Sequence, residues 1–316
     1  MENVKGRIVK GLGGLYEVMT EDGGRIECRA KGVFRHEHTA PTVGDLVSVG
    51  RDELGNSVIA EIDERKNLLI RPPLANMSVL FCVIPVKNPE PDILTLDKLI
   101  AIADDLSIEP VVVITKTDLD EERAEELAGI YRHAFTVFKT TLTKPETVMP
   151  LMEYVFEKAD REEKGLPRSI FAFAGASGAG KSTLMNLLFP TLSISTGSVS
   201  RKTQRGRHTT RHVELFPLES ITKESCRGFV ADTPGFSMLD FERFDFFDKD
   251  DLPYAFREFR ELVGNCRYTR CTHLCEEGCA VVEAVNEGKI PKSRHNSFVA
   301  LYNILKNKNP WDKKRK

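Results

Sequence analysis

Short runs in which apolar and polar residues alternate fill the first part of the chain. Such alternation is typical of half-buried β-strands, and glycines that favour turns separate the runs. Five strands are therefore predicted, at residues 7–10, 15–18, 25–30, 46–49 and 58–62. So many short strands in so short a segment predict a small β-barrel of the OB-fold type.

The pattern changes after Arg71-Pro72-Pro73, which we interpret as a linker. The run at residues 78–84 is continuously apolar, as expected for a parallel strand buried on both faces. From there strands and helices alternate, which predicts a doubly wound α/β domain. The predicted strands are 78–84, 110–114, 134–138, 169–174 and 227–231, and the predicted helices are 94–106, 121–133, 147–158 and 183–189.

Two further stretches, residues 252–263 and 291–305, space their apolar residues as helices do. The chain is therefore predicted to be a multi-domain α/β protein. We place a barrel at residues 1–68, an α/β domain at 69–238 and a helical domain at 239–316.

The composition is that of a soluble globular protein, with 41% apolar and 29% charged residues. A net charge of -2 means that a nucleic-acid partner would have to use local basic patches. No run is apolar enough to span a membrane, and no apolar signal segment follows Met1. We expect a cytoplasmic monomer with no membrane partner.

A glycine-rich turn between the strand at 169–174 and the helix at 183–189 carries the strongest chemical signal. Its G-x-x-x-x-G-K-S pattern in that context predicts a phosphate-binding loop, or P-loop, rather than a chance match. Lys181 would reach the β- and γ-phosphates, and the Ser182 hydroxyl would bind Mg²⁺. The predicted nucleotide-binding residues are Gly175, Ala176, Ser177, Gly178, Ala179, Gly180, Lys181, Ser182 and Thr183.

The strand at 110–114 ends in Thr115-Lys116-Thr117-Asp118, which resembles the N-K-x-D motif of GTPases. The Asp118 carboxylate can accept hydrogen bonds from guanine N1–H and the exocyclic amine, whereas adenine offers an acceptor there. The stem of Lys116 can cover the base. Alone, the tetrapeptide is more often a helix cap than a base reader, but its place at a strand end in a chain with a P-loop favours base recognition.

Two more motifs follow the P-loop. Residues 201–211 carry no acid and resemble a switch loop, in which Thr209 or Thr210 would complete the Mg²⁺ shell; an ordinary basic loop is the alternative. Asp232-Thr-Pro-Gly235 matches D-x-x-G, with Asp232 holding Mg²⁺ through water and the Gly235 N–H sensing the γ-phosphate. In most GTPases the base motif comes last. Here it comes first, which predicts a circular permutation.

Cys266, Cys271, His273 and Cys279 have the residue types and spacing of a closed structural Zn²⁺ site. Cys275 is the competing ligand, and reduced cysteines in a helical core are the alternative. Two basic features stay open: Arg29, Lys31, Arg35, His36 and His38 on the barrel, and the lysine-rich tail with Trp311, each an RNA contact or a solvated surface.

This combination resembles the RsgA (YjeQ) family of circularly permuted GTPases. The motifs that carry the resemblance are the P-loop, Gly206-Arg-His-Thr-Thr210, Asp232-Thr-Pro-Gly235 and the cysteine spacing. The resemblance implies GTP hydrolysis to GDP, stimulated by the small ribosomal subunit during its late maturation, with Mg²⁺ and one structural Zn²⁺. Thr115 in place of Asn departs from GTPases at large.

Phe236 stands where many GTPases have the glutamine that orients the attacking water. A phenylalanine cannot do so, and His208 is our candidate for that catalytic role, to which the resemblance also points. Two other functions stay open: a P-loop ATPase or kinase, against which Asp118 argues, and an RNA-binding scaffold whose P-loop only senses nucleotide.

Overall fold

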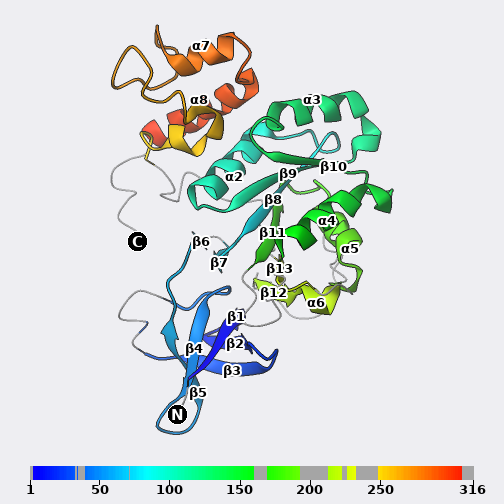
Figure 1. Cartoon of the computed structure of the whole chain (residues 1–316), viewed down its shortest axis with the longest axis vertical. Coiled ribbons are helices and arrows are strands. Elements are labelled where there is room, and N and C mark those ends of the chain that lie inside the picture. Colours follow the sequence, from blue (N-terminus) through cyan, green and yellow to red (C-terminus); the bar gives the residue numbers. More distant parts are fainter. Residues whose placement is uncertain are drawn as a thin grey trace. The chain divides into compact units, whose positions relative to one another are not determined.

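The computed structural model describes residues 3–32, 34, 40–70, 72–159, 169–192, 213–222, 226–232 and 248–307 (Figure 1). The chain forms two compact units, each assembled from three segments. The first unit comprises Met1–Phe81, Lys144–Phe173 and Lys181–Phe236, and the second comprises Cys82–Thr143, Ala174–Gly180 and Ser237–Lys316. The domain limits expected from the sequence stay predictions.

The first unit begins with a closed five-stranded barrel, drawn in blue in Figure 1. Its strands follow the order β1-β2-β3-β5-β4, and β1 closes the ring by pairing with β4. Ile8, Val18 and Ile59 fill its interior at zero exposure. The predicted strands are confirmed, with these bounds: β1 (Val4–Leu12), β2 (Leu15–Thr20), β3 (Arg25–Ala30), β4 (Leu46–Arg51) and β5 (Ser57–Ile62).

Strand β1 also pairs with β12 (Glu214–Pro217). The sheet continues from there, since β12 pairs with β13 (Phe229–Asp232) and β13 pairs with β11 (Ile170–Gly175). The sequence did not predict β12. The first unit also contains β6 (Leu68–Ile70), β7 (Pro73–Ala75), η2 (Pro145–Val148), α4 (Met149–Lys158), α5 (Lys181–Leu188), η3 (Pro190–Leu192) and α6 (Leu218–Ile221).

Of the expected linker, Pro73 opens strand β7, which pairs with β6 in a small hairpin, and Arg71 lies outside the described residues. Leu69 and Leu74 oppose each other in this hairpin, and both are buried, at 1% and 0% exposure. The prediction of a linker was wrong because it weighed the two prolines and overlooked the leucines that flank them.

The second unit contains the strand order β10-β9-β8. Buried apolar strands dominate here, since all seven residues of β8 are buried and β9 is buried except at its first residue, which is half-buried. The elements up to residue 143 match the predicted ones closely: β8 (Val79–Pro85, begun in the first unit), α2 (Ile93–Asp105), β9 (Glu109–Thr115), η1 (Thr117–Leu119), α3 (Glu121–Tyr131) and β10 (Thr136–Lys139).

The C-terminal part of the second unit differs from the prediction in one helix. The expected helix at 252–263 is replaced by two short 3₁₀ turns, η4 (Leu252–Ala255) and η5 (Arg257–Phe259). The break falls at Phe256, whose backbone is extended (φ −107°, ψ 105°) and whose fully buried ring packs edge-on against Phe298. Helix α7 (Ala280–Asn286) was not predicted, and α8 (Lys292–Lys306) confirms the helix expected at 291–305.

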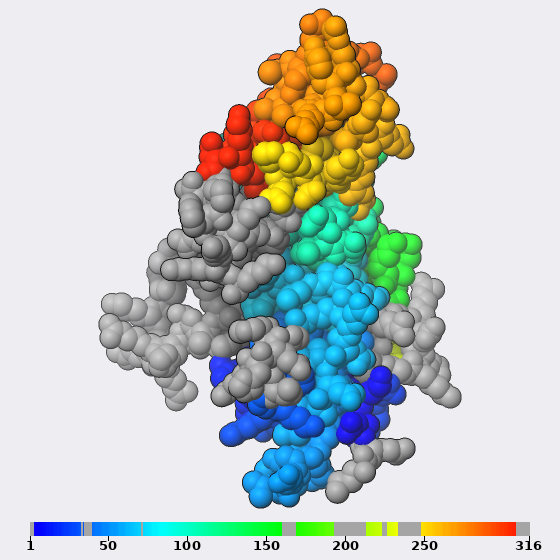
Figure 2. All heavy atoms as spheres, turned by 90° about the vertical axis from the view of Figure 1, so that its left-hand side faces the viewer, coloured from blue at the N-terminus to red at the C-terminus, as the bar shows by residue number. Residues whose placement is uncertain are grey.

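A buried charge network joins this C-terminal part to α2 and α3 within the second unit. Arg294 of α8 is 1% exposed and donates to Asp97 Oδ1 at 2.6 Å and to Glu258 Oε1 at 2.5 Å. Tyr131 of α3 donates to the same Asp97 oxygen at 2.8 Å. Figure 2 shows η4 and η5 (yellow) lying directly against α2 (teal). The network fixes the C-terminal elements to α2.

Candidate functional site

The P-loop turn is shaped by close backbone approach. Gly175 has φ +147°, and a Cβ there would lie 2.1 Å from the carbonyl oxygen of Val83 on β8. Gly180 has φ +95°, and a Cβ there would lie 2.5 Å from Leu142 Cδ1. Only glycine fits either position without strain, so these two glycines commit the sequence to a tight turn.

The expected base-reading motif is hydrogen-bonded to this turn. Thr115 is fully buried at the end of β9, and its hydroxyl donates to the carbonyl oxygen of Ala179 at 2.6 Å. Lys116 has φ +57°, and its ammonium group donates to the Gly178 carbonyl oxygen at 2.9 Å and to that of Asn88. Motif and P-loop turn, about sixty residues apart in sequence, therefore form one arrangement within the second unit.

A second loop supports the motif from the other side. The Thr117 hydroxyl lies 2.8 Å from the Thr141 hydroxyl, and the Thr117 N–H donates to the Thr140 carbonyl oxygen at 3.3 Å. The Asp118 carboxylate, in contrast, is exposed. The helix-cap interpretation does not apply to Asp118, because Asp120 caps α3 by accepting from the Arg123 N–H. Asp118 is thus held in place by its neighbours and open to a ligand.

The remaining described nucleotide residues belong to the first unit. Lys181 and Ser182 open α5, and Asp232 ends β13. Burial lowers the pKa of the Lys181 ammonium, so an anionic ligand beside it would stabilise its charged form. Burial, and then the nearby charge of Glu214, raises the pKa of the Asp232 carboxyl. A bound cation would stabilise the Asp232 carboxylate against both burial and the repulsion from Glu214.

Several predicted residues lie outside the described part of the chain. They are His208, Thr209, Thr210 and Gly235, together with Arg35, His36, His38 and the basic tail. Their roles stay predictions.

The four predicted zinc ligands lie together, with all donor atoms within 4.8 Å of one another. Cys266 Sγ is 3.8 Å from Cys279 Sγ, and His273 Nδ1 is 3.5 Å from both sulfurs. A tetrahedron with Zn–S of about 2.3 Å and Zn–N of about 2.05 Å has S–S edges of about 3.8 Å and S–N edges of about 3.6 Å. The donor set therefore fits Zn²⁺, and Cys275 stands outside it.

Electrostatics point the same way. Burial raises the pKa of the Cys271 thiol to about 12 and also raises that of Cys279. Burial lowers the pKa of the His273 imidazole, so the ring is held neutral, as a metal ligand must be. Thiolates in this site need a bound cation to be stable.

Sequence reasoning missed Glu276, which organises the metal loop. Its carboxylate accepts from the Thr272 N–H at 2.8 Å, the Leu274 N–H at 2.9 Å and the Thr272 hydroxyl. Sequence reasoning also missed Leu142, whose side chain lies against Gly180 of the P-loop turn. An acid placed between metal ligands is a signal that could have found Glu276; Leu142 gives no signal in the sequence.

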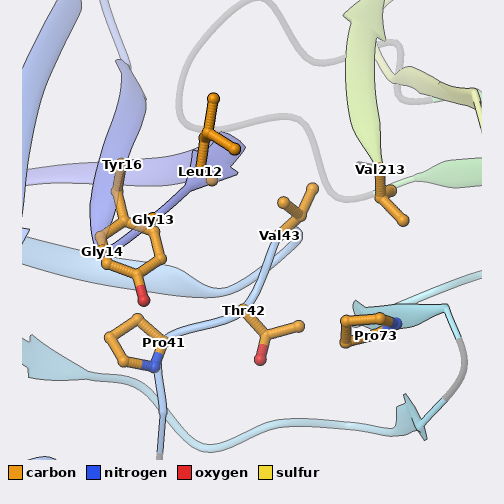
Figure 3. Close-up of a pocket in the computed structure, with 10 residues that line it drawn as sticks. Leu12, Gly13, Gly14, Tyr16, Pro41, Thr42, Val43, Pro73 and Val213 are labelled. Carbon is orange, nitrogen blue, oxygen red and sulfur yellow. The ribbon is translucent and has the colours of Figure 1, made fainter. Parts of the chain in front are cut away.

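The described part of the chain has no helix with the length and apolarity to cross a bilayer. A cavity of about 200 Å³ lies in the first unit, beside the turn that joins β1 to β2 (Figure 3). Its wall includes Leu12, Tyr16 and Val213. It is separate from the residues predicted to bind nucleotide.

A P-loop joined to a base-reading motif that precedes it in the chain defines a circularly permuted GTPase, a hydrolase. Two family models cover most of the sequence: RsgA N-terminal domain at residues 5–59 and RsgA GTPase at residues 62–242. The chain belongs to the RsgA GTPase family, and the fold class and GTPase activity expected from the sequence are confirmed. The family binds GTP or GDP with Mg²⁺.

Similar proteins agree over nearly the full length. The small ribosomal subunit biogenesis GTPase RsgA of Caldanaerobacter subterraneus is 41% identical over 98% of both chains. That of Clostridium beijerinckii is 40% identical over 98% of this chain and 100% of its own. YjeQ from Thermotoga maritima has a TM-score of 0.77 at 30% identity, covering 97% of this chain and 100% of its own. YloQ, a circularly permuted GTPase, has a TM-score of 0.73 at 31% identity, covering 98% and 96%.

Proposed function

We propose that this GTPase acts on the small ribosomal subunit during its late maturation in the cytoplasm, binding ribosomal RNA and hydrolysing GTP there. The observation that carries the GTP specificity is the pair of hydrogen bonds from Thr115 and Lys116 to the P-loop carbonyls. They leave the Asp118 carboxylate exposed at the place where guanine would be read. The names of the similar proteins support the choice of the small subunit.

The P-loop Lys181 would bind phosphate, and Ser182 and Asp232 would hold Mg²⁺, which supplies charge neutralisation when bound. Thr209 or Thr210 would complete the Mg²⁺ shell, and the Gly235 N–H would sense the γ-phosphate. One Zn²⁺ held by Cys266, Cys271, His273 and Cys279 would be structural. Asp232 supports the Mg²⁺ assignment because its half-buried carboxylate has an acidic neighbour and gains from a cation.

His208 would orient the attacking water, because Phe236 cannot. A neutral imidazole accepts a hydrogen bond from water, and an unperturbed histidine is mostly neutral at physiological pH. We expect hydrolysis to be slow in the free protein and fast on the small subunit.

The test measures GTP turnover with purified small subunits, with large subunits and with neither. Stimulation by small subunits alone supports the proposal, and equal turnover in all three refutes it. His208→Ala should lose the stimulated turnover while GDP binding is kept. Full stimulation of this variant would remove His208 from catalysis.

The alternative of an ATPase is tested by competition, in which GDP rather than ADP should displace bound nucleotide. A scaffold that only senses nucleotide would bind the small subunit and show no stimulated turnover.

A further inference from the structure

Charged residues form a row across five neighbouring strands of the first unit. From β3 to β13, the residues that oppose one another in register are Glu27, Glu17, Lys10, Glu214 and Asp232. All four strand pairs are antiparallel, so directly opposed side chains project to the same face. The row thus contains one cation among four acids, and it ends at the residue predicted to hold Mg²⁺.

Lys10 is bound to the acid beside Asp232. Its Nζ lies 2.9 Å from Glu214 Oε2, with the two side chains 43% and 33% exposed. Glu17, the other neighbour of Lys10, pairs instead with Arg25. Lys10, the one cation of the row, therefore forms its ion pair with Glu214.

The backbone positions Lys10 for this bond. The register of β1 against β2 shifts between Ile8 and Lys10, and such an irregularity re-aims the side chains that follow it. Strand β1 is in register with β12 only at Lys10 and Glu214. Beyond this pair the strands separate around the cavity in Figure 3, where Leu12 and Val213 line the wall. The barrel thus meets β12 at the residue that faces Asp232.

Glu214 affects Asp232 directly. The two residues are directly opposed in the antiparallel pair of β12 and β13, so both carboxylates lie on the same face of the sheet. Like charges opposed across a sheet repel each other, and a divalent cation at Asp232 would be attracted by both.

We infer that Glu214 is a second acidic positioning residue of the magnesium site, and that Lys10 of the barrel sets its effective charge. This inference rests on the proposed function, in which Asp232 holds Mg²⁺. It makes the barrel strand β1 part of the electrostatic environment of the proposed magnesium site in the first unit.

The sign of each effect follows from the charge next to Asp232. Lys10→Met leaves the Glu214 charge without a counter-ion, so Mg²⁺ should bind more tightly. Glu214→Gln removes a negative charge, so Mg²⁺ should bind more weakly. Each change should be about threefold to tenfold at low ionic strength and smaller in high salt.

A charge exchange separates electrostatics from structure. The double variant Lys10→Glu with Glu214→Lys keeps an ion pair between β1 and β12 but places the cation beside Asp232. Mg²⁺ affinity should then fall below that of Glu214→Gln. A purely structural pair would leave the affinity of the exchanged variant unchanged.

The experiment titrates Mg²⁺ against the full chain and follows retention of a fluorescent GDP analogue, so no hydrolysis is needed. Lys5→Met and Glu219→Gln are matched controls: Lys5 lies on the same strand and pairs with Asp63, and Glu219 is exposed on α6. Neither should shift the titration. Opposite shifts for Lys10→Met and Glu214→Gln support the inference; equal shifts, or none, overturn it.

Asp232→Asn distinguishes this inference from the proposed function. If that variant keeps the Mg²⁺ affinity of the original protein, the assignment of Asp232 fails and the inference fails with it. If it loses the affinity while the Lys10 and Glu214 variants show no shift, the proposed Mg²⁺ site stands and the inference alone is wrong.

Discussion

The nucleotide loops and the metal cluster of the second unit are held in place by different means. The loop at Thr115 is tied to the P-loop turn by hydrogen bonds between protein atoms, and Gly175 seats that turn against β8. The cluster brings three sulfurs and one imidazole together, and Glu276 accepts hydrogen bonds from two N–H groups and one hydroxyl of the loop around them. The comparison teaches that the nucleotide loops are held by contacts within the protein, whereas the metal cluster would need a bound cation to be stable.

Removal of the metal should have the largest effect on stability, and this effect should be confined to the metal cluster. Cys271→Ser, or a strong chelator, should lower the melting temperature by about 10 °C or more, because metal-binding energy here is folding energy. Nucleotide binding, measured below the new transition, should change little. Metal analysis and thermal denaturation provide the measurements.

Cys275→Ser is the matched control, since Cys275 is exposed and outside the cluster. It should keep both the zinc content and the melting temperature. A pure protein without zinc, whose melting curve ignores the chelator, would refute the metal assignment.

Gly175→Val should disrupt the nucleotide loops and leave the metal cluster intact. The new side chain would overlap the Val83 carbonyl oxygen, so β8 or the turn must move, at a cost of about 3 kcal/mol or more. GDP binding should be lost in a titration, while the purified variant keeps zinc. Gly264→Ala is the control: Gly264 also has a positive φ of +95°, but a Cβ there meets nothing within 4 Å. If both variants lose GDP equally, backbone strain rather than close approach is responsible.

Asp118→Asn changes the chemistry of the nucleotide loops without changing their shape. Loss of two charge-assisted hydrogen bonds to guanine should weaken GTP binding by about 100-fold. The preference should move toward xanthosine triphosphate, whose C2 carbonyl can accept from the new amide. Glu121→Gln, nearby and exposed, should leave both affinities unchanged. Unaltered GTP affinity of Asp118→Asn would remove Asp118 from the base site.

Thr115→Val should have the smallest effect. It keeps the shape of a fully buried side chain and removes the hydrogen bond to Ala179, which should cost about 1–2 kcal/mol of unfolding free energy. Thr115→Ser keeps the hydroxyl and should therefore keep most of the GDP affinity of the original protein. Equal stability of the valine variant and the original protein would mean that the preformed loops do not depend on this bond.

The sequence predicted those elements whose signals are local. The apolar runs of β8, β9 and β11 and the glycine-rich turn can be recognised in the sequence, because burial on both faces and close approach restrict the residue types directly. Strand β12 has four residues and a proline at its end, so no period could identify it. The prolines at the β6–β7 hairpin likewise concealed the buried leucines beside them.

Contacts between distant segments could not be predicted. The bond from Thr115 to Ala179 spans 64 positions and the pair Lys10–Glu214 spans 204. The residue types at these positions are compatible with many surroundings. The metal ligands were the exception, because three thiols and an imidazole within fourteen residues have few other uses in a reduced protein.

The buried charge network between α8 and α2 also affects how the second unit unfolds locally. Arg294 and Asp97 are 1% and 0% exposed, and separating them would leave two charges in an apolar interior. Their helices should therefore open together, as one cooperative unit in native-state hydrogen exchange. The slowly exchanging amides of α2 and of α8 should then exchange at similar rates. If the amides of α8 exchange earlier, the two helices belong to separate cooperative units.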